Sequence, residues 1–265
     1  MSFSGDKELA TITRLYKCRR TAVLTGPAAL HVMGIKTLRR ITSIDLVLRG
    51  AAKAKRKDLW GKGVVYRSGH LDDQLVVSYR GFEVVRLIRA LFDTYRYHGR
   101  TAALVSIESA LQRSDITNEY LLAQSTLLPR SQGIRGFREL LTYASQLSES
   151  PLETLARDAV LQAELPGVVS VKQQVQFKYY DSWGLMHFGR ADMEINGCIV
   201  VEVDGRTKSR DNWEYVTHEE RERERWLLHG EKVLIRATWE EVVSGELVER
   251  VRNALVLTGY AKRAG

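Results

Sequence analysis

The sequence predicts a mixed α/β protein in two parts, a basic N-terminal part over residues 1–147 and a second part over residues 148–265. Three observations support this prediction. Short strand-like runs and then helices with apolar residues spaced by three and four fill the first part. The stretch Ser148-Glu149-Ser150-Pro151 marks a boundary. After it the predicted elements follow the order helix, three strands, helix, strand, helix, which is typical of an α/β or α+β domain.

The first part reads as a small sheet followed by a helical segment. A short helix begins near Thr25-Gly26-Pro27, because proline suits the first turn of a helix, and it ends near Gly34. The apolar spacing of Leu87, Ala90, Leu91 and Tyr95 predicts the first helix after the sheet. In chain order we expect a helix over 7–20, strands over 42–48, 75–79 and 82–85, and helices over about 86–98, 101–112, 116–127 and 134–147.

The second part begins with a capping signal. Ser150, Pro151 and Glu153 predict the start of a helix that runs to about residue 164. A strand over 169–179 and a hairpin over 186–204 follow, then a heavily charged helix over 211–229 and a strand over 232–237. Thr238, with Glu241 three residues later, predicts the start of the last helix.

The hairpin is the stretch on which the function prediction depends. A two-residue Asn196-Gly197 loop would split the apolar residues between the two faces of the sheet. A three-residue loop over 195–197, with Gly197 left-handed, pairs Glu194 with Cys198 and keeps the apolar residues together. This register places Asp192, Glu202 and Asp204 on one face and Ala191, Met193, Val201 and Val203 on the other.

Composition narrows the class of protein. The chain is 44% hydrophobic and 27% charged, as is ordinary for a globular protein. It has no apolar run of transmembrane length and no secretory signal, so we expect no membrane partner. The two cysteines, Cys18 and Cys198, form no disulfide framework or zinc spacing, which predicts a reducing cytoplasm.

The net charge of +8 is unevenly distributed. Residues 1–150 hold 24 Lys and Arg against 13 Asp and Glu, whereas residues 151–265 hold 16 against 19. Such asymmetry indicates an anionic partner, most commonly nucleic acid. The loop or hairpin over 49–67 concentrates the charge beside Trp60, in a pattern that suits a phosphate backbone and an exposed base; a solvated loop with a half-buried tryptophan is the alternative. The candidate DNA-binding residues there are Lys53, Lys55, Arg56, Lys57 and Lys62.

Four short motifs in the second part resemble known nucleases. They are Ser150-Pro151-Leu152-Glu153, Arg190-Ala191-Asp192, Val201-Glu202-Val203-Asp204-Gly205 and Ile235-Arg236-Ala237-Thr238-Trp239-Glu240. In this order and spacing they resemble the PD-(D/E)XK nuclease superfamily. More narrowly, residues 148–256 resemble a bacterial domain family related to very-short-patch repair endonucleases. The first 150 residues resemble the segment that precedes this domain in actinobacterial type IV antitoxin-like (abortive infection) proteins, which usually begin with a winged helix-turn-helix. That resemblance implies a restriction-endonuclease-like αβββαβα core after a small sheet and a helical segment.

The chain departs from the superfamily pattern at two places. The pattern implies lysine at position 204, where this chain has Asp204, as the narrower family also often does. That family commonly has histidine a few residues after Asp-Gly, where this chain has Thr207, Lys208 and Ser209. Lys208 could therefore supply the positive charge that the pattern places at position 204, or nuclease activity could be lost.

The resemblance implies a Mg²⁺-dependent (or Mn²⁺-dependent) hydrolysis of phosphodiesters. Converging carboxylates bind such an ion, and three acids on one sheet face repel one another unless a cation or arginines compensate. Asp192 and Glu202 would be the first metal ligands and Asp204 a third, with Lys208 stabilising the leaving oxygen. Glu153 would reach the same edge, or would only cap its helix. Arg190 would hold a phosphate, or would pair with Glu202.

We therefore expect a metal-dependent DNA endonuclease or nickase whose basic N-terminal part grips DNA. The alternative is a DNA-binding transcriptional regulator or antitoxin-like protein with a degenerate nuclease fold, and a third reading is a protein-interaction module. The sequence leaves open the target, DNA against RNA, the biological pathway, and whether the chain is a monomer or a homodimer.

Overall fold

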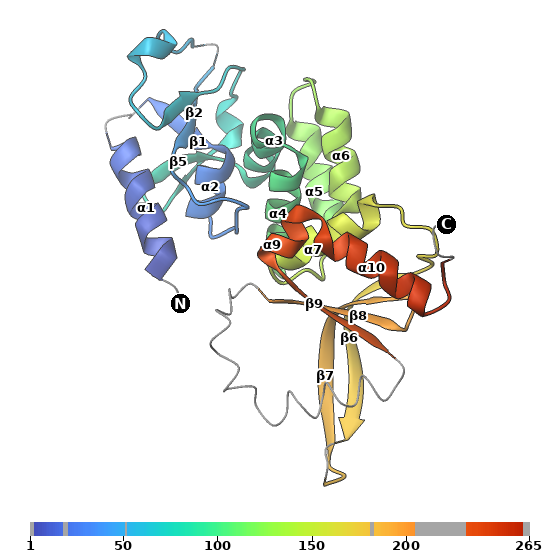
Figure 1. The fold of residues 1–265 in the computed structure, drawn as a ribbon. Coiled ribbons are helices and arrows are strands. Elements are labelled where there is room, and N and C mark those ends of the chain that lie inside the picture. Colours follow the sequence, from blue (N-terminus) through green and yellow to red (C-terminus); the bar gives the residue numbers. More distant parts are fainter. Residues whose placement is uncertain (1–2, 18–20, 51, 181–182, 205–231, 262–265) are drawn as a thin grey trace. The chain divides into compact units, whose positions relative to one another are not determined.

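The structure, a computed structural model, describes residues 3–17, 21–50, 52–180, 183–204 and 232–261. The chain divides into two compact units, residues 1–146 and 147–265, a boundary one residue from the expected one. Each unit has its own hydrophobic core. Each also has its own mixed sheet, which can be followed in Figure 1. The predicted mixed α/β class is thus confirmed at that level.

Unit 1 contains a five-stranded sheet in the order β3-β2-β1-β5-β4. Its strands are β1 (Ala22–Thr25), β2 (Ile44–Leu48), β3 (Val64–Tyr66), β4 (Val76–Tyr79) and β5 (Phe82–Val85). The sequence did not predict β1 and β3. All four residues of β1 are buried, and the strand pairs antiparallel with β2 and parallel with β5. A buried run of three apolar residues and a threonine has no alternation, so periodicity could not reveal it.

The helices of unit 1 are close to the predicted ones. They are α1 (Phe3–Tyr16), α2 (Gly26–Val32), α3 (Leu87–His98), α4 (Arg100–Leu111), α5 (Asn118–Gln124) and α6 (Ile134–Tyr143). Three 3₁₀ turns accompany them, η1 (Lys57–Leu59), η2 (Asp73–Leu75) and η3 (Ser125–Leu127). Helix α3 carries a buried ion pair, because Arg89 Nε donates to both carboxylate oxygens of Asp93 at 3.0 and 2.9 Å. Thr25 of β1 donates to the same carboxylate at 2.6 Å, which ties α3 to the sheet.

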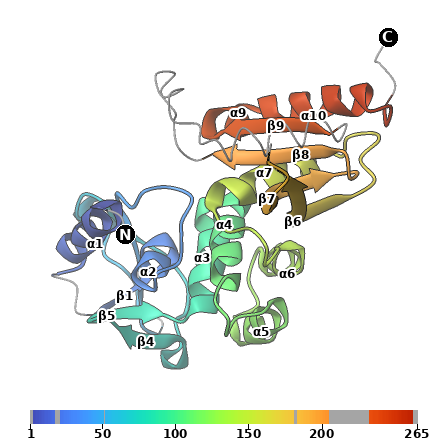
Figure 2. The same cartoon turned by 90° about the horizontal axis from the view of Figure 1, so that it is seen from below.

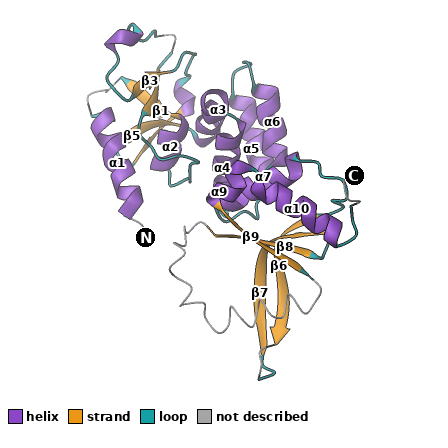
Figure 3. Ribbon diagram, in the orientation of Figure 1, coloured by secondary structure: helices purple, strands orange, loops and turns teal. Residues whose placement is uncertain are grey.

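Unit 2 contains a four-stranded sheet in the order β6-β7-β8-β9. Its elements are α7 (Pro151–Gln162), β6 (Val171–Tyr180), β7 (Met186–Ile195), β8 (Ile199–Asp204), β9 (Val233–Thr238), α9 (Trp239–Ser244) and α10 (Glu246–Leu257). Strands β6, β7 and β8 form an antiparallel meander, and β9 runs parallel to β8. Figure 2 shows α9 and α10 lying along one side of β8 and β9, and Figure 3 shows the same elements by type. The predicted charged helix over 211–229 lies outside the described residues.

Two capping predictions have different outcomes. Thr238 and Glu241 form the predicted capping box at the start of α9. The expected single last helix is wrong, because Gly245 adopts φ 87° and separates α9 from α10. At α7, Ser150 accepts the amide of Glu153 as predicted, at 3.1 Å. The Glu153 carboxylate, however, accepts the amide of Glu149 rather than closing the box on Ser150.

The β7–β8 hairpin has the predicted loop length in a shifted position. Its register pairs Ile195 with Ile199 and Met193 with Val201, so the three-residue loop comprises residues 196–198 rather than 195–197. Asn196 and Gly197 both have positive φ, 53° and 75°. Because the pairing shifts by two, even residues still oppose even residues, and the apolar residues of β8 stay together.

Asn196 explains why the loop begins where it does. Its Oδ1 accepts the amides of Val169 and Ser170 at 2.8 and 3.0 Å, and its Nδ2 donates to the carbonyl of Gly167 at 2.7 Å. Asparagine tolerates left-handed φ better than other residues with a side chain. The side chain thus holds the loop against the segment before β6.

The apolar residues of β7 do not share one face, which corrects the prediction for Ala191. Met193, Val201 and Val203 belong to the core that α7, α9 and α10 cover. Ala191 lies instead with Val200 in a second cluster, against Phe177 and Leu234. The strand therefore turns over between Ala191 and Met193.

The described part of the chain contains no helix of the length and apolar character needed to cross a lipid bilayer.

Candidate functional site

Asp192 lies where two ladders of the sheet are interrupted. The β7–β8 ladder ends at Met193 and Val201, one residue before Asp192. In the β6–β7 ladder, Gln173 pairs with Met193 and Val175 pairs with Ala191. Between these two pairs, Gln174 and Asp192 form no ladder pair with each other. Gln174, which stands opposite Asp192 there, has φ 52°. Left-handed backbone at a residue with a side chain is uncommon and concentrates at functional sites.

The Asp192 side chain replaces part of the missing ladder. Its Oδ2 accepts the backbone amide of Val203 at 2.8 Å, so the carboxylate bridges the gap between β7 and β8. Burial raises the pKa of Asp192 from the usual 3.8 to about 6, although the hydrogen bond from Val203 acts to lower it. The charges of Glu153 and Glu202 raise this pKa further, and that of Arg190 opposes them. The two neighbouring carboxylates thus act on the ionisation of Asp192 in the same direction as burial.

Glu153 reaches this site from the first turn of α7. Its Oε2 accepts the Glu149 amide at 2.9 Å and the side-chain amide of Gln174 at 2.8 Å. Helix α7 and the interrupted part of β6 thereby hold the Glu153 carboxylate in place. Glu153 lies close enough to Asp192 for its charge to raise the pKa of that carboxyl.

Glu202 and Asp204 follow on β8. Glu202 stands opposite Arg236 of β9, whose Nε lies 3.4 Å from Glu202 Oε2. Asp204 ends β8 opposite Thr238. The structure thus brings Glu153 and Glu202 close enough to Asp192 for their charges to raise its pKa. It also shows a cation beside Glu202 that the sequence did not lead us to expect.

Arg190 does not pair with Glu202, so that alternative is wrong. Its two terminal nitrogens each donate to one carboxylate oxygen of Glu149 at 2.7 Å, a bidentate pair that raises the pKa of Arg190. Glu149 was not among the predicted site residues. The Ser148-Glu149-Ser150 boundary pointed to the position without indicating its partner.

The carboxylates of the candidate site have partners within the protein. Among the residues that the structure describes, no three His, Cys, Asp or Glu side chains lie in an arrangement that could hold a metal. Their oxygens are instead engaged by Val203, Gln174 and Arg236. Lys208, the proposed source of positive charge, lies outside the described residues.

The basic loop of unit 1 is exposed. Its five candidate cations, Lys53, Lys55, Arg56, Lys57 and Lys62, all face solvent. Trp60 is half-buried against Tyr66, with ring centroids 5.5 Å apart, and its indole N–H donates to the Lys55 carbonyl at 2.8 Å. The loop therefore has a fixed anchor, and both the DNA-binding and the solvated-loop reading fit this geometry.

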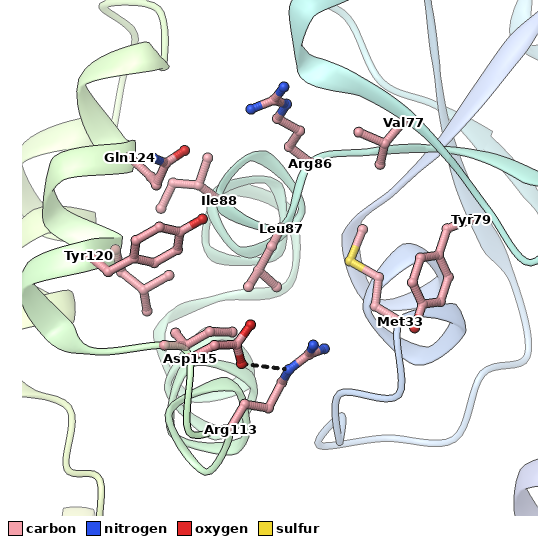
Figure 4. Close-up of a pocket in the computed structure, with 12 residues that line it drawn as sticks. Met33, Val77, Tyr79, Arg86, Leu87, Ile88, Arg113, Asp115, Tyr120 and Gln124 are labelled. Atoms are coloured by element: carbon pink, nitrogen blue, oxygen red, sulfur yellow. Dashed lines mark hydrogen bonds and ion pairs between the residues drawn. The ribbon is translucent and has the colours of Figure 1, made fainter.

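Unit 1 also contains features that sequence reasoning missed. Asp45 is buried between Arg67, at 2.8 Å, and His98, and it lines a cavity of about 560 Å³ with Arg39 and Arg40. Only spatial proximity joins Asp45 to His98, since 53 residues separate them in sequence. A smaller cavity of about 300 Å³, shown in Figure 4, is mostly apolar. Its lining includes Met33, Tyr79, Leu87, Ile88 and Tyr120, and an ion pair of Arg113 with Asp115 at 3.4 Å.

No family model matches the chain, and no curated protein or solved structure is significantly similar to it.

Proposed function

We propose that residues 148–265 form a nuclease domain of the PD-(D/E)XK type that hydrolyses phosphodiester bonds in DNA with Mg²⁺ or Mn²⁺. The order of elements in unit 2, a helix, three meander strands and a strand parallel to the third, supports this assignment. In this proposal the basic loop of unit 1 binds the DNA backbone.

One observation supports the proposal above the others. Asp192 is released from both of its ladders, is half-buried, and interacts with two further carboxylates. A carboxylate whose pKa lies near 6 at an irregular point of a sheet is unfavourable for stability, so a function is the better explanation. A structural role alone would be met by asparagine, which can also accept the Val203 amide.

The donor set suits a hard divalent cation, because Mg²⁺ and Mn²⁺ prefer carboxylate oxygens. Asp192 and Glu202 would hold the ion, with Asp204 as a third ligand, and Glu202 would have to turn away from Arg236 to do so. A bound ion would supply charge neutralisation on the phosphate and a more acidic water. Asp192 Oδ1 is not the oxygen that accepts the Val203 amide. In this proposal Glu153, whose Oε2 accepts the side-chain amide of Gln174, would take a proton from water.

Two variants and one control test the proposal. Asp192→Asn and Glu202→Gln should abolish nicking of supercoiled plasmid in Mg²⁺ or Mn²⁺, while DNA binding persists or tightens because repulsion of phosphate decreases. Glu249→Gln removes a carboxylate on α10 that pairs with Arg252, so it should leave nicking unchanged. Residual nicking by Asp192→Asn at the wild-type rate would contradict the proposal.

A second function is favoured by the contact of Arg236 with Glu202. A guanidinium beside the carboxylate can take the role of the missing lysine, or can replace the ion and leave a DNA-binding regulator with a degenerate nuclease fold. Calorimetric titration with Mg²⁺ and Mn²⁺ distinguishes the two. Wild-type protein that binds DNA but neither ion, and cuts no duplex, nicked or single-stranded substrate, is the regulator.

A further inference from the structure

The outer half of the β6–β7 hairpin is a two-stranded arm, defined here as residues 176–180 and 183–190. Within the described residues, β8 pairs with β7 at residues 193–195, and the outer residues of β7 pair with β6. Figure 1 shows the arm extending well beyond the ends of β8 and β9. The arm thus projects beyond the four-stranded part of the sheet, although one of its side chains, Tyr179, is buried.

Large apolar side chains are exposed on this arm. The exposed fraction is 56% for Tyr180, 73% for Trp183, 62% for Leu185, 47% for Met186 and 67% for Phe188. A solvated two-stranded ribbon gains nothing from so many exposed apolar groups, and such concentrations mark binding surfaces.

Register places the exposed residues on the face that leads to the carboxylate site. Tyr180 pairs with Met186, Lys178 with Phe188, and Gln176 with Arg190, and residues of a pair share a face. Along β7, alternate residues continue this face from Met186 through Phe188 to Arg190, whose charge acts on Asp192. At about 3.4 Å per residue, Met186 and Asp192 lie ~20 Å apart along the strand, the span of a few nucleotides.

The charges of the arm suit a polyanion. Its described residues include Lys178 and Arg190 and no carboxylate, and the Lys178 ammonium lies 5.8 Å from the centroid of the Phe188 ring. Aromatic rings interleaved with cations are the usual platform for nucleic-acid bases that are not stacked in a duplex. Arg190 is already paired with Glu149, so Lys178 is the cation to which a neutral apolar partner would offer no anion.

We propose that the arm binds unpaired nucleotides of a DNA strand whose scissile phosphate lies at Asp192. Phe188 and Tyr180 stack on the bases, and Lys178 contacts a phosphate. The substrate class is therefore DNA with an unpaired segment, such as an overhang, a flap or a bubble, rather than fully paired duplex. This inference rests on the proposed function and specifies its substrate.

Binding measured in EDTA tests the inference separately from catalysis. The full-length protein is titrated into a single-stranded oligonucleotide and a matched duplex, each with one 2-aminopurine, and anisotropy and 2-aminopurine emission are followed. Phe188→Ala and Tyr180→Ala should each weaken single-strand binding on the order of 5- to 150-fold and change duplex binding less than about twofold. Leu257→Ala removes an apolar side chain that is 74% exposed on α10, and it should change neither affinity.

The outcomes separate the inference from the proposed function. Arm-dependent single-strand binding by a protein that cuts nothing would support the arm and reject the nuclease. Asp192-dependent cutting with unchanged single-strand binding in both arm variants would reject the arm as the binding site for unpaired nucleotides.

Two other occupants of the arm would also overturn the inference. One is a second copy of the chain, seen as a wild-type dimer in sedimentation that Phe188→Ala dissociates; the other is lipid, seen as Phe188-dependent co-sedimentation with phosphatidylcholine–phosphatidylglycerol vesicles. Circular dichroism melts of both variants should match wild type, because both side chains are exposed.

Discussion

Replacing Asp192 with asparagine should make the protein more stable above pH 6. The pKa of Asp192 is about 6 in the folded protein, against the usual 3.8. Between these values the native state holds a proton that the unfolded chain has already released. The free energy of unfolding therefore falls as pH rises through this window, and the penalty is complete above pH 6.

The size of the effect follows from the shift. A difference of about 2 pKa units corresponds to a ceiling of ~3 kcal/mol. Asp192 is only half-buried, so solvent screening reduces this ceiling to ~1–2 kcal/mol. Asparagine keeps the shape and can still accept the Val203 amide, so Asp192→Asn should raise the free energy of unfolding by that amount at pH 7.5.

Urea unfolding in EDTA at pH 5 and 7.5 measures the gain. At pH 5 the gain should be roughly half that at pH 7.5, because half of the titration window has been passed. Glu249→Gln, which removes an exposed carboxylate, should give no pH-dependent gain. Destabilisation by Asp192→Asn at pH 7.5, or a gain equal at both pH values, would refute the reasoning.

The remaining predictions concern the ion, the basic loop and the hairpin. Affinity for Mn²⁺, measured by calorimetry, should fall about tenfold per pH unit below pH 6, since the ion must displace the Asp192 proton; a flat profile would exclude Asp192 as a ligand. Alanine at four exposed cations should lower the slope of log affinity against log salt by about 0.9 for each lost phosphate contact, and an unchanged slope would place the DNA surface elsewhere; these cations are Lys53, Lys55, Arg56 and Lys57. Asn196→Ala should lower the free energy of unfolding by ~2–4 kcal/mol, because three hydrogen bonds and a left-handed residue are affected; a loss below 1 kcal/mol in urea unfolding would contradict this.

Sequence patterns predicted most of the elements, because helix periodicity and caps are local properties. Ser150 and Thr238 cap their helices as expected. The requirement that apolar residues stay on one face predicted the three-residue length of the hairpin loop. The loop position was wrong by one residue, since the hydrogen bonds of Asn196 to the segment before β6 decide it. No local pattern contains that contact.

The candidate site was predictable in its acids and not in their surroundings. Asp192, Glu153 and Glu202 stand out by residue type and spacing. Glu149 beside Arg190 and Arg236 beside Glu202 were missed, because both pairs join residues more than 30 positions apart. Strict alternation also put Ala191 on the wrong face, because it assumes an unbroken ladder.

The interruption of the sheet at Asp192 accounts for both the proposed site and the arm. An unbroken ladder would give the Val203 amide a backbone partner, so Asp192 would have no need to bridge the strands. The same interruption ends the pairing of β7 with β8 at Met193, so that among the described residues the outer part of β7, with the exposed Phe188, pairs with β6. If function depends on this break, then a variant with regular pairing at Asp192 should have a higher free energy of unfolding. In that variant the carboxylates should no longer lie next to the arm. Gln174, opposite Asp192, has φ 52°, a backbone conformation that costs stability in a residue with a side chain.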